Sequence, residues 1–92
     1  MEFKHENNRI YLNNAEGEMV AEVTFPALND DVVNIIHTFV DDSLRGQGIA
    51  GKLMEETVQQ LRRTDKKAIL SCSYAVNWFE KNPEYSDLIS KE

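Results

Sequence analysis

Eight consecutive residues near the middle of the chain combine glycines with cationic side chains and could bind an anion. They are Arg45, Gly46, Gln47, Gly48, Ile49, Ala50, Gly51 and Lys52. An apolar run, 32–40, leads into them, and an amphipathic run, 49–61, leads out. A glycine-rich turn between a strand and a helix leaves backbone N–H groups unpaired and directs them, with the positive end of the helix dipole, toward one place. This stretch is therefore a candidate anion-binding loop.

Two common phosphate-binding motifs fit this loop only in part. Residues 46–51 satisfy the G-x-G-x-x-G pattern of dinucleotide-binding folds, but 41–45 separates the strand from the first glycine. The next strand also ends, in 71–73, without the acidic residue that this motif needs. Residues 46–52 satisfy G-x-x-x-x-G-K, but Leu53 stands where a P-loop needs Ser or Thr to hold Mg²⁺. The sequence therefore disfavours both motifs.

The patterns around the loop predict an α+β fold with a mostly antiparallel five-stranded sheet, one parallel β-α-β step and a short C-terminal helix. The run 32–40 is β-branched and apolar on both faces, so it predicts a central strand covered on both sides. A helix between two strands of one sheet implies that these strands are parallel. The expected strands are 2–6, 9–12, 19–25, 32–40 and 68–73, and the expected helices are 49–61 and 74–81.

Length and composition predict a single domain, 1–92, and limit the classes of function. The sequence has 92 residues and lacks both an apolar run of about 20 residues and a signal-peptide core, so we expect a cytoplasmic protein without a membrane segment. A single cysteine excludes an intramolecular disulfide and a multi-cysteine zinc site. The formal net charge of −6 disfavours nucleic-acid binding and is compatible with a cationic partner. We expect a monomer.

The sequence Arg45-Gly46-Gln47-Gly48-Ile49-Ala50 resembles the (Gln/Arg)-x-x-Gly-x-(Gly/Ala) signature of the GNAT superfamily of N-acetyltransferases. In that superfamily the loop binds the pyrophosphate of acetyl-CoA, and its context is similar: a meander, a central strand, the loop, a helix, a parallel strand and a shorter helix. The chain also resembles a compact single-domain GNAT-like subfamily, which shares the Gly-x-Gly-Ile-Ala loop, a cysteine on the fifth strand and an ending similar to Asn-Pro-Glu-Tyr. The resemblance implies a GNAT-like fold and acetyl-CoA as cofactor.

The resemblance also implies where the cofactor lies. Amides of the loop would hold the pyrophosphate, because glycines let the backbone approach phosphate oxygens, and Arg45 could add a charge-assisted contact. The edge of Phe39 and Val40 would pair with the pantetheine amides, and a backbone N–H near Val40 would donate to the thioester oxygen. The implied cofactor-binding residues are Phe39, Val40, Arg45, Gly46, Gln47, Gly48, Ile49, Ala50, Gly51 and Lys52.

The catalytic residues are less clearly implied, because Phe79 stands where the family usually has a tyrosine acid. Cys72 ends the fifth strand, where the thioester would lie; it could be a nucleophile, a proton donor or a small buried hydrophobe, an ordinary thiol pKa being about 8.5. His37 shares a face with Ile35 and Phe39 in an unbroken strand, and could be a base, an orienting partner of Cys72 or a core histidine. The alternative acids are Tyr74 and Tyr85.

Three functions remain open on the sequence. The first is acetyl transfer from acetyl-CoA to an amine, directly or through Cys72, with a small molecule, a lysine or a protein N-terminus as acceptor. The second is a module that binds or senses acetyl-CoA without turnover, which the phenylalanine at 79 favours. The third is a small interaction protein that uses the same fold.

Overall fold

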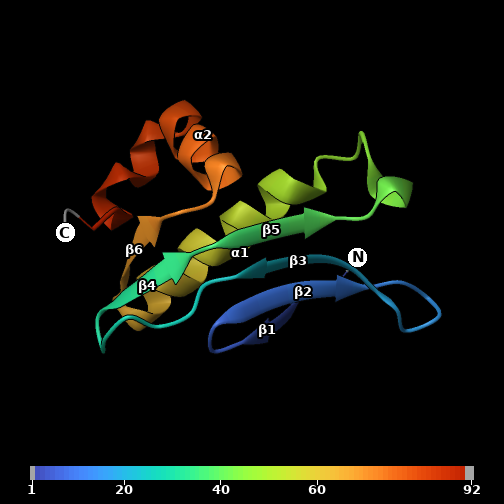
Figure 1. Cartoon of the computed structure of the whole chain (residues 1–92), viewed down its shortest axis with the longest axis horizontal. Coiled ribbons are helices and arrows are strands. Elements are labelled where there is room, and N and C mark those ends of the chain that lie inside the picture. Colours follow the sequence, from blue (N-terminus) through green and yellow to red (C-terminus); the bar gives the residue numbers. More distant parts are fainter. Residues whose placement is uncertain (1, 91–92) are drawn as a thin grey trace.

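The computed structural model describes residues 2–90, whose strands form two small sheets (Figure 1). Antiparallel strands in the order β1-β2-β3-β5 form the larger sheet, and β4 pairs with β6 in parallel to form the smaller one. This arrangement confirms the expected α+β class with one parallel β-α-β step. The strands are β1 Lys4–Glu6, β2 Arg9–Asn13, β3 Met19–Thr24, β4 Val32–Ile35, β5 His37–Val40 and β6 Lys67–Leu70. The helices are α1 Ile49–Thr64, α2 Ser73–Lys81 and the 3-10 segments η1 Asp42–Leu44 and η2 Pro83–Leu88.

The predicted unbroken strand over 32–40 is wrong, because the strand is divided at Ile36. Before this residue, β4 pairs with β6; after it, β5 pairs with β3. Ile35 is fully buried, whereas His37 is exposed and Thr38 is half-buried. One extra residue in a strand reverses the alternation of its side chains, which is the effect of a β-bulge. His37 therefore does not share a face with Ile35, and the strand is not covered on both sides.

Helix α1 covers one face of the larger sheet. Its buried apolar residues recur at helical spacing, as the sequence predicted, and the helix contacts β2, β3 and β5. They pack on inward-facing strand residues such as Ile10, Val23 and Phe25, all at most 1% exposed. Complete burial of a side chain of this size stabilises the fold by about 1.5–3 kcal/mol. Within residues 2–90, neither this helix nor any other is long and apolar enough to span a membrane.

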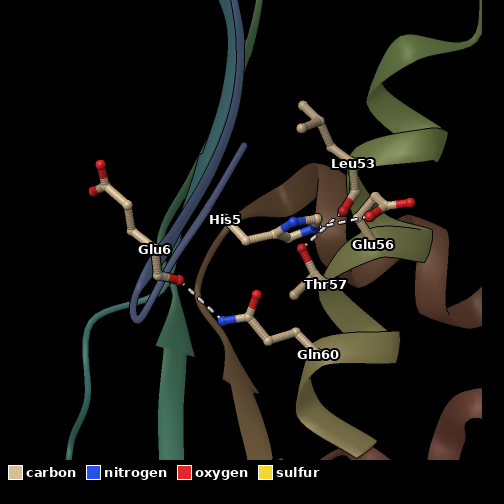
Figure 2. A network of polar contacts seen from close by, with 6 residues as sticks. All are labelled: His5, Glu6, Leu53, Glu56, Thr57 and Gln60. Atoms are coloured by element: carbon tan, nitrogen blue, oxygen red, sulfur yellow. Dashed lines mark hydrogen bonds and ion pairs between the residues drawn. The ribbon is translucent and has the colours of Figure 1, made fainter. Parts of the chain in front are cut away.

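Polar contacts hold β1 against α1 (Figure 2). His5 Nε2 lies 2.8 Å from Glu56 Oε1, and Gln60 Nε2 donates to the backbone oxygen of Glu6 at 3.0 Å. The buried hydroxyl of Thr57 donates to the Leu53 carbonyl of its own helix, at 2.8 Å. Because His5 faces the helix, alternation along β1 places the neighbouring Glu6 side chain on the opposite face of the sheet.

The C-terminal segment packs as an aromatic cluster beside α1. Helix α2 ends at Lys81, just before Asn82 and Pro83, as the sequence predicted. Trp78 stacks on Tyr85 with ring centroids 5.4 Å apart, and the Arg62 guanidinium lies 5.0 Å from the centroid of the Tyr85 ring. These contacts fix η2 against α1 and bring the start of α2 close to the start of α1.

Candidate active site

The glycine loop has the backbone of an anion-binding turn. Gly46 and Gly48 have φ of 81° and 70°, a left-handed conformation in which an L side chain costs about 1–2 kcal/mol. Gly48 is the N-cap of α1 and offers no side-chain hydrogen bond, and the first turn of the helix contains no acidic residue. The first-turn N–H groups therefore lack an anionic or side-chain partner from the helix itself. A bound anion would satisfy them.

The segment before the loop is fixed by its own cap. The Asp41 carboxylate accepts from the Ser43 hydroxyl at 2.6 Å and from the Ser43 backbone N–H at 3.0 Å, and these bonds lower the pKa of Asp41. Arg45 pairs with Asp42 at 2.9 Å, but both side chains are at least 80% exposed. Exposed pairs of this kind contribute less than about 1 kcal/mol, so the Arg45 guanidinium is free to turn toward an anion.

A cleft of about 230 Å³ opens beside the loop. Val40 on β5 and Tyr74 on α2 both line it, and the loop supplies most of its remaining wall. Asp41 N–H donates to Val20 O at 2.8 Å. Because successive N–H groups of a strand point to opposite sides, the Val40 N–H is directed away from β3, toward the free edge of β5. That edge is unpaired within the described chain, since β5 is the last strand of its sheet.

The central strand segment and the chain after β6 separate once β4 has ended at Ile35. The N–H groups of Ser71 and Cys72 both donate to Ile35 O at 3.0 Å, and pairing between the chain segments stops there. Just beyond, the half-buried Cys72 thiol lies 3.6 Å from Thr38 Oγ1. The structure thus joins Cys72 to Thr38 and places His37 on the opposite face of β5. Sequence analysis missed Thr38, because an unbroken strand would have turned its side chain the other way.

Tyr74 is the phenol that lines the cleft. A Cβ added at Gly51 would lie 3.8 Å from the Tyr74 hydroxyl, so this hydroxyl lies against the first turn of α1. Burial, with a smaller contribution from nearby Cys72, raises the pKa of Tyr74. Phe79 is 3% exposed in the core, and Tyr85 is stacked on Trp78. Tyr74 is therefore the tyrosine with access to the cleft.

The predicted cofactor residues divide into two groups. Those that line the cleft are Val40, Arg45, Gly46, Gly48, Ile49, Ala50 and Gly51. Gln47 and Lys52 are exposed nearby without lining it, and Phe39 is 37% exposed on the outer face of β5. Ile49 is 2% exposed, so its side chain belongs to the core and only its backbone is available to a ligand.

Gly51 differs from the two loop glycines, and its replacement by alanine is expected to stabilise the fold. Its φ is outside the left-handed region, and an added Cβ would make ordinary contacts 3.8 Å from Tyr74 and Trp78. Gly51→Ala should raise the free energy of unfolding by about 0.4–1 kcal/mol, since the unfolded chain loses entropy. Thermal unfolding should show a Tm a few degrees higher. Gly46→Ala, which forces alanine into φ of 81°, should lower it.

The comparison with protein families agrees with this fold. The model of the GCN5-related N-acetyl-transferase family matches residues 9–88. The chain belongs to this family, which confirms the relationship inferred from the loop. Protein NATD1 of Gallus gallus is 36% identical over 52 residues, which are 56% of this chain and 47% of the relative. The chain thus spans about half the length of the curated relatives it matches.

Solved structures share the whole fold. The solution structure of a GCN5-like protein from Staphylococcus aureus is 36% identical, with a TM-score of 0.78, and the match covers 97% of this chain and 87% of that one. A GNAT family acetyltransferase from Elizabethkingia anophelis, crystallised with acetyl-CoA bound, is 14% identical with a TM-score of 0.63. That match covers 80% of this chain and 51% of the other, and it shows similarity of fold alone.

Proposed function

We propose that the protein is an N-acetyltransferase that takes an acetyl group from acetyl-CoA and transfers it to an amine. One observation carries this proposal: the uncapped start of α1 and its left-handed glycines open into a cleft beside the free edge of β5. The N–H groups of the loop suit a pyrophosphate, and the strand edge suits an extended chain with amide groups. The Elizabethkingia relative of the same fold binds acetyl-CoA, which supports this assignment.

The loop also has room for the cofactor. A Cβ built at Gly46 or Gly48 meets no protein atom within 4 Å, so the backbone at both positions faces open space where phosphate oxygens could approach. Arg45 could leave its exposed pair with Asp42 and bind a phosphate oxygen. The amides of 45–51, with Lys52 and Gln47 at the rim, would hold the pyrophosphate, and Phe39-Val40 would pair with the pantetheine.

Bound acetyl-CoA supplies the acetyl group as a thioester, and the protein must move two protons. We assign the His37 imidazole as the base that removes a proton from the acceptor ammonium. The amine nitrogen then forms its bond to the carbonyl carbon, the carbon–sulfur bond breaks, and the thiolate takes a proton from an acid of the protein. The Val40 N–H, which points away from β3, would donate to the carbonyl oxygen.

Two side chains are candidates for the second proton transfer. Cys72 lies beside Thr38 on β5, where its thiol could protonate the thiolate or first accept the acetyl group itself. Tyr74 lines the cleft, and its raised pKa keeps its hydroxyl protonated through the neutral range. Phe79, which is buried, can do neither.

Acetyl-CoA titration followed by a turnover assay tests this function. We expect saturable shifts of the backbone amide signals of residues 39–52 in NMR spectra, and release of CoA that depends on added amine. Absence of saturable shifts would refute the proposal. Saturable binding without amine-dependent release, across a panel of small amines, lysine peptides and peptide N-termini, would identify the alternative instead: a module that binds or senses acetyl-CoA.

A further inference from the structure

The face of the larger sheet opposite α1 carries an exposed row of side chains. Register pairs Glu6 with Arg9, Arg9 with Thr24, and Thr24 with His37, so one row crosses all four strands. Helix α1 packs on the other face of this sheet (Figure 1). The row begins at His37, beside the point where β5 and the chain after β6 separate, and ends at the edge strand β1.

A shallow groove of about 650 Å³ is lined by three residues of this row, Thr24, Arg9 and Glu6. Ile36 and Pro26 form the apolar part of its wall, and the Ile36 side chain, at the bulge, is 48% exposed. Thr24 and Arg9 lie in its middle, and Glu6 closes its far end. The groove therefore extends from Ile36, the chain neighbour of His37, to the carboxylate of Glu6 on β1.

The charges of the groove favour a cation at the far end. Arg9 is the only guanidinium lining it, and it is paired with Glu22 and stacked 3.8 Å above the Tyr11 ring. Glu6 also approaches it, with Oε2 3.5 Å from Arg9 Nη1, so two carboxylates share one cation. The Glu6 side chain is 54% exposed and the Glu22 side chain only 16%, so the excess negative charge is available at Glu6.

From this arrangement we propose that the acceptor is a linear aliphatic diamine or polyamine that lies along the groove. This inference rests on the proposed function. The reacting nitrogen lies beside His37, which takes its proton; methylenes contact Ile36 and Pro26; and a second ammonium pairs with Glu6. Three strand spacings of about 4.8 Å separate the ends of the row by about 14 Å. Glu6 leans toward Arg9, which shortens the distance that the ligand must span.

Two amines with the same eight-carbon chain isolate the contribution of the second ammonium to turnover. The nitrogens of 1,8-diaminooctane are nine bonds apart, about 11 Å at about 1.2 Å per bond, whereas n-octylamine lacks the distal charge. With acetyl-CoA present, we expect kcat/KM to be up to about fivefold higher for the diamine, as one exposed ion pair allows. Glu6→Gln should remove this preference. Glu16→Gln, the same change in the exposed β2–β3 turn, should preserve it.

A second variant tests the other end of the groove. Ile36 is exposed, so Ile36→Lys should fold and should place a like charge beside the reacting ammonium, lowering kcat/KM for both amines by about tenfold. Leu28→Lys, at a position 53% exposed and outside the groove, is its matched control. Both variants should bind acetyl-CoA as the wild type does.

NMR gives a readout that does not depend on turnover. Titration with 1,8-diaminooctane should shift the amide signals of residues 7, 8 and 36, and Glu6→Gln should weaken these shifts. CoA release at equal rates with both probes, unchanged by Glu6→Gln and Ile36→Lys, would overturn this inference and leave the proposed function standing. Failure of the wild type to bind acetyl-CoA would overturn the proposed function itself.

Discussion

Gly48→Asp is expected to raise the Kd for acetyl-CoA by at least about 100-fold, which corresponds to about 2.7 kcal/mol. The position has φ of 70°, and its side chain would point into the open space above the uncapped first turn of α1. A carboxylate there would occupy the place of a phosphate oxygen, bind the free N–H groups and repel the remaining negative charge. Isothermal titration calorimetry measures the loss directly.

The chain offers a matched control for this substitution. Gly17, in the turn between β2 and β3, also has a left-handed φ, 83°, and an added Cβ there also meets nothing within 4 Å. Gly17→Asp therefore introduces the same charge and the same backbone strain far from the cleft. Binding lost only in Gly48→Asp, with both variants folded, is the expected pattern. Equal affinities in the two variants would contradict the assignment of the loop.

Cys72→Ala is expected to lower kcat by about 100-fold or more and to abolish any acetyl adduct of the protein. An activated nucleophile or a general acid each contributes on this scale. Mass spectrometry of the wild type after exposure to acetyl-CoA should show the addition of one acetyl group, carried as a thioester on Cys72. Thr38→Val, which removes only the hydroxyl 3.6 Å from the thiol, should retain the adduct.

An unmodified wild type with full turnover in Cys72→Ala would exclude covalent transfer and assign the proton to Tyr74. In that case Tyr74→Phe, and not Cys72→Ala, should lower kcat. Its matched control is Tyr85→Phe, because Tyr85 packs through its ring against Trp78 and does not line the cleft. Burial raises the pKa of Tyr74, so its hydroxyl keeps its proton as pH rises. Deprotonation of Tyr74 should therefore lower kcat only at pH values above the ordinary pKa of tyrosine.

The sequence alone determined the glycine loop, for which we propose cofactor binding, because its conformation is local. Glycines at 46 and 48 permit the left-handed turns, and the helix begins at Ile49, right after them. Both the backbone geometry and the direction of the free N–H groups follow from residues adjacent in the chain. The same holds for the end of α2 before Pro83 and for the parallel pairing of β4 with β6, which the intervening helix requires.

The tertiary structure alone decided which side chains of β5 face Cys72 and which face the opposite side of the sheet. Alternation along 32–40 assumes an unbroken strand, but β4 and β5 pair with different partners, and the extra residue Ile36 between them reverses the alternation. That reversal turns Thr38 toward Cys72 and His37 toward the outer face of the sheet. The choice is made by hydrogen bonds to segments far away in the chain, Thr24 on one side and Ser71 on the other, and no local pattern encodes it.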